Sequence, residues 1–491
     1  MKTTLYFSNK TNAGDYPYEA LNKKLGELGI KINPEEHSFL FKNVEISYKL
    51  RHKHSITRYI LSFSLKRPRE QLTSKETKRR YNIVCSLIGK LPNEIDVDSL
   101  KFKRTNISDE IDMSHWEVKN PFTSEKVNLF DNYNYKKLRS LYSRKIPLKP
   151  TFILVDKSST SKLIINELRP FFSEKEEVIE TSVNFVREKI DSRVDKNRIF
   201  LFILYNQNEN QYIKLKKFFL QNNIPSQFIH MDDKKFWFKT KNLIPEILTK
   251  ASCYPFEFPE RLSKVDGYIC LTDIYDKKNP LFGINITYNS EKGLFKNTVK
   301  IYSDINYRAD RLFINFIENN LTLLVDKIAT LGTELVGKEV NIYLTKYWKS
   351  KDIYLLIEKL KNKDIFVKKI FYISFFSDKF VFKGMESLSE GKIPYIIKDK
   401  YLAYLQPNTI IGLFGSLFPI SLELANINSG EIITKEDIEE YLWLIKRRVY
   451  RLQYINMLRY PEFIKYAKKI RELNLSEEDL SKLTLNGDLL I

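Results

Sequence analysis

The stretch QYIKLKKFFLQNNIPSQFIHM, residues 211–231, predicts a helix, a tight turn and a strand in direct succession. Apolar residues recur at helical spacing through its first half, NNIPS supplies turn residues, and an apolar run follows. Tyr212 and Lys216 are four residues apart and therefore share one face of the helix, which we expect to lie near its N-terminus. Gln227 stands at the head of the strand. Because a helix N-terminus attracts anions, these side chains are candidates for binding one.

The flanking sequence alternates between strand and helix patterns. TFILVD (151–156) and RIFLFILY (198–205) are continuous apolar runs, as expected of strands that are buried on both faces. Amphipathic helices are predicted at 158–172, 174–190 and 210–223. This order predicts a small, doubly wound, Rossmann-like domain over residues 149–258.

A second lysine completes the candidate anion site. Lys250 closes the predicted helix NLIPEILTKASCYPF (242–256) and adds a second ammonium group. We hypothesise that Tyr212, Lys216, Gln227 and Lys250 grip a terminal phosphate while the tyrosine ring stacks on the first base. Each residue taken singly has a simpler interpretation, since surface lysines are usually solvated and a helical tyrosine usually borders a core.

Residues 259–491 predict a second α/β domain. DGYICLTDIY (266–275), NPLFGINITYN (279–289) and NTVKIYSD (297–304) are successive strand candidates of an antiparallel meander. A long helix (308–331), a strand (340–345) and a helix (350–362) follow, and another helix begins at Lys435. Three antiparallel strands followed by helix, strand and helix is the order of an RNase H-like core.

The first 148 residues predict a basic α+β module, with a strand at 55–68 and a helix at 74–92. The fold class is therefore α/β, with this module, a Rossmann-like domain and an RNase H-like domain in sequence. The uncharged stretch 401–422 is long enough to span a bilayer. It is interrupted by polar residues and prolines, so two buried strands with a loop are expected and no membrane insertion.

Charge favours a polyanionic partner. The 491 residues include 81 Lys and Arg against 61 Asp and Glu, a formal net charge of +20. Neutralising phosphates releases counterions, which drives nucleic-acid binding, and the many aromatic residues offer stacking surfaces. The alternative is a soluble protein that is merely rich in lysine. Three widely separated cysteines and the lack of an apolar N-terminal segment predict a reducing, cytoplasmic location.

On these residues the sequence resembles the Argonaute family. Its MID domain binds a guide 5′-phosphate through a Tyr-x3-Lys pair, a later Gln and a further Lys, as at Tyr212, Lys216, Gln227 and Lys250. FGSLFPISLEL (414–424) and YPEFIKYAKKI (460–470) are similar to late segments of the family's PIWI domain. The first 148 residues are too short for the usual N-terminal and PAZ domains together. The resemblance therefore implies a short or truncated, PAZ-lacking prokaryotic type, with an N-terminal domain, a MID domain (149–258) and a PIWI domain (259–491).

The resemblance also implies a contribution from the chain's last residue. In this family the C-terminal carboxylate folds back toward the guide phosphate and helps hold a cation. Ile491 supplies that carboxylate here, and with Gln227 it forms a candidate Mg²⁺ site at the guide 5′-phosphate. A frayed tail is the alternative.

The same resemblance bears on nuclease chemistry. In members that cut, the first Asp lies within the opening strand, where this chain has Thr272, with Asp273 one residue later. A one-residue shift turns a side chain to the other face of the strand unless a bulge restores it. Lys346 and Lys468 stand at the positions of two further ligands. Ammonium groups repel Mg²⁺, so Asp273, Thr272 and these lysines are vestigial and no catalytic metal is expected. Asp352 is expected at an exposed helix start.

The resulting hypothesis is a guide-dependent nucleic-acid-binding protein without enzymatic activity. A short guide, for which RNA is favoured, pairs with a complementary target, for which DNA is favoured. Arg447, Arg448 and Arg451 are candidate backbone contacts, although helix-surface solubility explains them equally well. Target recognition would signal to a separate effector protein in prokaryotic defence, with residues 1–148 as its docking surface or as part of the duplex channel. The alternatives are an active guided endonuclease and a generic nucleic-acid-binding scaffold.

Overall fold

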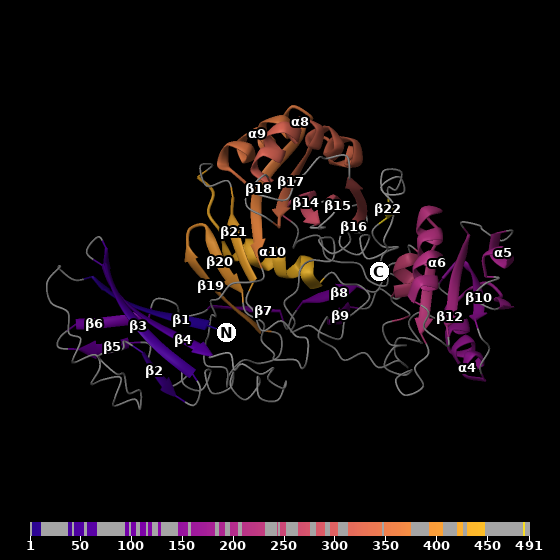
Figure 1. Ribbon diagram of the computed structural model, residues 1–491, viewed down its shortest axis with the longest axis horizontal. Coiled ribbons are helices and arrows are strands. Elements are labelled where there is room, and N and C mark those ends of the chain that lie inside the picture. Colours follow the sequence, from indigo (N-terminus) through magenta and orange to yellow (C-terminus); the bar gives the residue numbers. More distant parts are fainter. Residues whose placement is uncertain are drawn as a thin grey trace. The chain divides into compact units, whose positions relative to one another are not determined.

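The computed structural model has two compact units, shown together in Figure 1. The first comprises Met1–His115, Ile373–Ile438 and Asn456–Arg459, and the second Trp116–Tyr372, Glu439–Ile455 and Tyr460–Ile491. The structure describes residues 2–10, 38–41, 44–53, 56–65, 94–97, 100–104, 109–113, 116–119, 126–128, 146–155, 159–181, 186–191, 197–204, 209–230, 243, 246–251, 264–274, 281–289, 295–302, 313–345, 348–374, 392–405, 420–425, 430–446 and 485–486.

The N-terminal part of the first unit is a six-stranded antiparallel sheet in the order β2-β3-β4-β1-β6-β5. Its strands are β1 (Lys2–Lys10), β2 (Ser38–Phe41), β3 (Val44–Lys53), β4 (Ile56–Leu65), β5 (Glu94–Val97) and β6 (Leu100–Arg104). Strand β4 confirms the strand predicted at 55–68. The helix predicted at 74–92 lies outside the described residues.

The same unit holds four further strands, β7 (Asp109–Asp112), β19 (Lys392–Asp399), β20 (Leu402–Leu405) and β21 (Ile420–Leu424). Strand β20 pairs antiparallel with β19 and β21, and β7 pairs with β19. Strands β20 and β21 confirm that the uncharged stretch 401–422 contributes strands. Across the described residues, no helix combines the length and apolarity needed to cross a bilayer.

The Rossmann-like domain is a four-stranded parallel sheet in the order β11-β10-β12-β13. The strands are β10 (Lys149–Val155), β11 (Glu177–Thr181), β12 (Arg198–Leu204) and β13 (Ser226–His230). The helical segments are α4 (Ser159–Leu168), η1 (Arg169–Phe171), α5 (Val186–Asp191) and α6 (Glu209–Gln221). The buried runs of β10 and β12 form the two central strands, as predicted.

One helix prediction in this domain is wrong. Residues 174–190 do not form a single amphipathic helix, because residues 177–181 are strand β11 and helix α5 begins only at Val186. β-branched residues dominate the centre of this strand, where only Ile179 is buried. Glu177 also pairs with Arg198 at the start of β12. Parallel pairing with β10 thus overrides a weak helical periodicity.

The RNase H-like part begins with the predicted antiparallel meander of β14 (Gly267–Ile274), β15 (Leu281–Asn289) and β16 (Phe295–Tyr302). Strands β17 (Lys338–Leu344) and β18 (Ile365–Ser374) add parallel neighbours beyond β14, and β22 (Leu485–Asn486) pairs with β16. The remaining elements are the hairpin β8 (Glu117–Lys119) and β9 (Lys126–Asn128) and the helices α8 (Phe313–Leu331), η4 (Thr333–Leu335), α9 (Ser350–Lys361) and α10 (Lys435–Lys446).

The two faces of this sheet differ in chemistry. Helices α8 and α9 contact each other, and a Cβ at Gly332 after α8 would lie 2.8 Å from Ile286 Cδ1. The α8 side of the sheet is aliphatic, with Ile269, Ile286 and Ile342 fully buried. The opposite side contacts α10 through the rings of Tyr343 and Tyr441, whose centroids are 6.2 Å apart.

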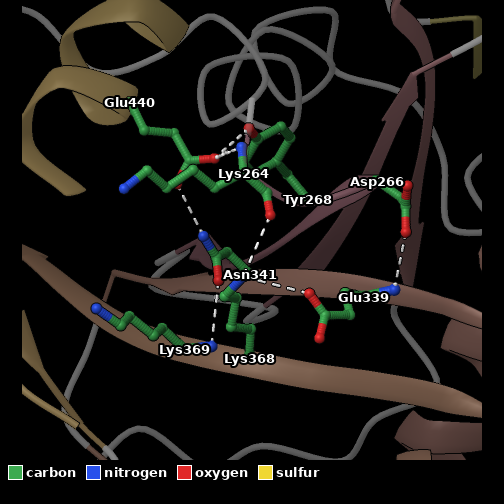
Figure 2. Close-up of polar contacts among 8 residues, drawn as sticks. All are labelled: Lys264, Asp266, Tyr268, Glu339, Asn341, Lys368, Lys369 and Glu440. Carbon is green, nitrogen blue, oxygen red and sulfur yellow. Dashed lines mark hydrogen bonds and ion pairs between the residues drawn. The ribbon is translucent and has the colours of Figure 1, made fainter. Parts of the chain in front are cut away.

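A buried carboxylate fixes α10 to this polar face. Glu440 is 2% exposed and accepts hydrogen bonds from Tyr268 Oη at 2.7 Å, the Lys264 N–H at 2.9 Å and Asn341 Nδ2 at 2.9 Å (Figure 2). Asn341 Oδ1 in turn accepts from the Lys369 N–H at 3.1 Å, beside an irregularity in the β17–β18 pairing. Glu440 therefore connects α10 directly to β14 and β17, and through Asn341 to β18.

Replacing Glu440 with Ala is expected to lower the free energy of unfolding by about 3 kcal/mol, because buried donors on Tyr268 and Asn341 would lose their acceptor. Urea unfolding of the full chain measures this difference. The matched control is Glu436→Ala, an exposed glutamate in the first turn of the same helix, for which a loss below about 1 kcal/mol is expected. Equal losses in the two variants would contradict a structural role for the network.

Candidate nucleic-acid interface

The candidate anion site is built around β13, one of the two edge strands of the Rossmann-like sheet. Helix α6 ends at Gln221, and Asn223, with φ of 52°, lets the chain reverse toward this strand. Phe219 of α6 contacts Phe202 of β12, whose ring stacks on Phe228 of β13 with centroids 4.5 Å apart. The side of β13 that carries Phe228 therefore faces α6.

Lys216 lies on this α6 side. Its side chain is 6% exposed and its Nζ lies 5.8 Å from the centroid of the Phe228 ring, a cation–π distance. It is the eighth of the thirteen residues of α6, so it lies about 10 Å along the axis from the first residue of the helix. The expectation that Lys216 lies near the helix N-terminus is thus wrong. Its ammonium group lies beside strand β13 and not beside the free N–H groups of the first helical turn.

Gln227 and Lys250 meet on the other side of the strand. Successive side chains of a strand point to opposite faces, so Gln227 is turned away from Phe228 and α6. The Lys250 ammonium donates to Gln227 Oε1 and, at 3.0 Å, to the Ser226 carbonyl oxygen. Both side chains are buried, Gln227 at 8% and Lys250 at 3% exposed. Gln227 thus begins a strand and Lys250 ends the helical residues 246–250, as predicted, and the structure brings the two into contact.

The Lys250 ammonium lies at the outer edge of the sheet. The Pro225 carbonyl accepts from the Phe200 N–H of β12 at 3.0 Å. In a parallel ladder, alternate residues direct their backbone groups to the same neighbour, so the Ser226 carbonyl points away from β12. Lys250 binds that outward carbonyl, and no described strand pairs with this edge of β13. Buried polar side chains from both faces of the sheet thus lie beside one strand, with Lys216 on the α6 side and Gln227 and Lys250 on the other.

Glu246 is a member of this cluster that the sequence analysis did not consider. Its carboxylate oxygen Oε2 accepts a hydrogen bond from Gln227 Nε2 at 3.2 Å. Glu246 precedes Lys250 by four residues, the spacing at which acidic and basic side chains share a helix face. That spacing was visible in the sequence and would have identified the residue.

Two other predicted site residues are only partly placed. The backbone of Tyr212 lies in the first turn of α6, one turn before Lys216, as the four-residue spacing predicts. Its side chain lies outside the described part, and so does Ile491. Their assignment to a phosphate site stays a prediction.

The predicted nuclease positions are described in part. The β14–β15 pairing runs in regular register from Gly267 to Ile274, without a bulge, through the pair Asp273 and Phe282. Thr272 is 1% exposed, and its Oγ1 lies 3.3 Å from Cys270 Sγ on the same strand face. Asp273 is placed by its backbone alone. Lys346, Lys468, Arg447, Arg448 and Arg451 lie outside the described residues.

The described acids do not assemble a metal site. Within the described ranges, no three His, Cys, Asp or Glu side chains lie close enough to hold an ion. Asp352 occupies the first turn of α9, as its helix-start motif predicts, but it is fully buried. The expectation of exposure is wrong, and the nearby residues Trp348, Ile353 and Leu356 are buried as well.

Comparison with known proteins identifies the architecture. No protein-family model and no curated protein sequence matches the chain. The crystal structure of Kluyveromyces polysporus Argonaute with a guide RNA aligns at a TM-score of 0.53 and 12% identity, covering 88% of this chain and 63% of that one. The C-terminal lobe of a budding yeast Argonaute aligns at a TM-score of 0.52 and 11% identity, covering 81% of this chain and 97% of the lobe.

The chain has the fold of the Argonaute C-terminal lobe. This confirms the predicted fold class, an α/β chain with a Rossmann-like and an RNase H-like domain. The chain spans about 63% of the length of the Kluyveromyces polysporus Argonaute. The predicted boundaries at 148/149 and 258/259 stay predictions beside the two units described above.

Replacing Lys250 with Met tests the structural part of this site. The stem is retained, but Gln227 Oε1 and the Ser226 carbonyl lose a charged donor, so we expect a loss of about 1–3 kcal/mol in the free energy of unfolding. The control is Lys162→Met, at an exposed position of α4, with an expected change within about 0.5 kcal/mol. Urea unfolding of both variants gives the comparison, and an unchanged Lys250→Met protein would contradict the contacts at the β13 edge.

Proposed function

We propose that this chain is a guide-dependent nucleic-acid-binding protein that holds the 5′-phosphate of a short guide at the edge of β13. The observation that carries the proposal is the meeting of Gln227 and Lys250 at that edge, with Lys216 on the opposite side of the same strand, within an Argonaute-like fold. The structurally similar Kluyveromyces polysporus protein is described with a guide RNA, which supports RNA as the guide.

The chemistry of the cluster suits a phosphate. Two ammonium groups and an amide supply N–H donors, and hydrogen bonds from charged donors to phosphate are stronger than neutral ones. Burial of Lys216 and Lys250 limits their screening by salt. Tyr212, one helical turn before Lys216, is the candidate for stacking on the first base. Base pairing of the guide then selects the target, for which we propose DNA.

A magnesium ion is not part of this proposal. Mg²⁺ prefers hard oxygen ligands, and the oxygen expected from the side chain of Gln227 already accepts from the Lys250 ammonium. An ammonium bound to a prospective ligand atom repels a divalent cation. Gln227 therefore does not fit as a ligand of the ion, and we propose that the two lysines neutralise the phosphate charge instead.

We propose further that the RNase H-like domain binds the guide–target duplex without cutting it. The support is Thr272 in the regular register of β14, where cutting members of the Argonaute family have Asp, together with Lys346 and Lys468 in the sequence. Two-metal hydrolysis needs carboxylates at these positions. The +20 net charge still favours binding of a duplex backbone, with Arg447, Arg448 and Arg451 as candidate contacts.

An inactive domain leaves the biological output to another protein. We propose a short, PAZ-lacking prokaryotic Argonaute that signals target recognition to a separate effector in defence against invading DNA. The support is the resemblance of its sequence to that type. Residues 1–148 are the proposed docking surface or duplex-channel wall, and their described part is largely a six-stranded sheet.

A preference for 5′-phosphorylated oligonucleotides is the first expected result. We expect the dissociation constant of a 5′-phosphorylated guide to be at least about tenfold lower than that of its 5′-hydroxyl counterpart, because one good charge-assisted contact contributes more than about 1.4 kcal/mol. Lys250→Met and Lys216→Gln should each reduce this ratio, and Lys162→Met should not. Fluorescence anisotropy measures the constants. Equal affinity for both guides in the unmodified protein would favour a generic nucleic-acid-binding scaffold.

Lack of target cleavage is the second expected result. With a 5′-phosphorylated guide, a complementary target and Mg²⁺ or Mn²⁺, we expect the target to stay intact on a denaturing gel, because lysines replace metal-binding carboxylates. Guide-dependent cleavage that is lost in Asp273→Ala would instead establish the active endonuclease.

A further inference from the structure

We propose that Glu246 is a built-in counter-anion of the β13-edge cluster, which stabilises the cluster when it is empty and competes with the phosphate that binds there. This inference rests on the proposed function. It makes Glu246 a specificity-determining residue that sets how strongly the site distinguishes a phosphorylated end from a hydroxyl end.

The geometry fixes how Glu246 and Lys250 act on each other. An ammonium group only donates, so Lys250 must face the oxygen of the Gln227 amide. A carboxylate only accepts, so Glu246 must face the nitrogen of the same amide, at 3.2 Å. The amide of Gln227 thus bridges a cation and an anion, in the single orientation that satisfies both.

Burial explains why the bridge stabilises the empty site. Lys250 is only 3% exposed, and a buried ammonium costs several kcal/mol unless opposite charge and hydrogen bonds compensate for lost water. Glu246 is partly exposed and supplies negative charge to this cluster from one turn earlier on the same helix. Its polarising hydrogen bond also makes the Gln227 oxygen a better acceptor for Lys250.

The same charge opposes an incoming phosphate. Lys216 and Lys250 contribute two positive charges to the strand edge, and the carboxylate of Glu246 lowers the net charge of the cluster by one. A phosphate bound through Lys250 and Gln227 places like charge near the Glu246 carboxylate, in a site where burial limits screening. Removal of this carboxylate should therefore strengthen phosphate binding while it weakens the empty protein.

The test compares Glu246→Gln with the unmodified protein and with Glu188→Gln, an exposed glutamate of α5 in the same domain. The measured quantity is the ratio of dissociation constants for 5′-hydroxyl and 5′-phosphorylated guides, obtained by fluorescence anisotropy at two salt concentrations. We expect Glu246→Gln to raise this ratio about tenfold, which corresponds to about 1.4 kcal/mol. The melting temperature of its guide-free form should fall, and Glu188→Gln should change neither quantity.

A second variant separates charge from positioning. Glu246→Ala removes the negative charge and the hydrogen bond to Gln227, so a charge effect raises the ratio again, whereas a purely positioning effect lowers it. A ratio that stays unchanged or falls in either variant, while the unmodified protein prefers phosphate, would overturn this inference alone. If neither the unmodified protein nor Glu246→Gln distinguishes the guides, the proposed function itself is overturned. A preference that appears only in Glu246→Gln would support Glu246 as the competing anion and reject phosphate anchoring by the native chain.

Discussion

The buried carboxylate of Glu440 is the contact on which the arrangement of the RNase H-like sheet and α10 depends. A carboxylate that is 2% exposed must recover the hydration it has lost, and here three donors do so. Those donors come from the segment before β14, from β14 itself and from β17. Each of these hydrogen bonds forms only within a narrow range of distances and angles. Helix α10 therefore cannot slide or rotate on the sheet without breaking more than one of them. The polar network thus specifies position, where aliphatic packing alone would tolerate several registers.

The contrast between the two faces of the sheet follows from this constraint. Under α8 the sheet is aliphatic. Burial of apolar area stabilises the packing of the helix on such a surface without fixing one position of the helix. Under α10 it carries Tyr268, Cys270, Thr272, Asn285 and Asn341, all nearly fully buried. The same polar face carries Thr272, whose hydroxyl lies 3.3 Å from the Cys270 thiol. The face thus keeps buried polar side chains that connect to one another, as Thr287 also does with Asn285 at 3.0 Å.

Sequence reasoning succeeded where the signal was local and failed where it depended on pairing. The continuous apolar runs of β10 and β12 and the turn before Gln227 each specify their own structure, so the parallel sheet and the contact between Gln227 and Lys250 could be predicted. Strand β11 could not, because its residues have both helical and extended periodicity and only pairing with β10 decides between them. The burial of Asp352 and the place of Lys216 beside Phe228 depend on packing against distant segments, which spacing along the chain does not encode. The part played by Glu246 could have been predicted from the sequence, because a Glu and a Lys four residues apart on a helix are a recognisable pair.

The location of the cluster at a strand edge has its own physical consequence. An outer strand presents unpaired backbone groups, which proteins usually cover or neutralise. Here the ammonium of Lys250 binds the outward carbonyl of Ser226, so the lysine is positioned by the backbone as well as by Gln227. A lysine held at two points has already lost most of its conformational freedom, and a ligand that binds it does not incur that loss again. Lys216 is held differently, by the Phe228 ring on the other face, so the two ammonium groups are fixed by independent contacts on one strand. A ligand that bridges them would therefore be recognised by their separation as well as by their charge, which a flexible pair of surface lysines does not achieve.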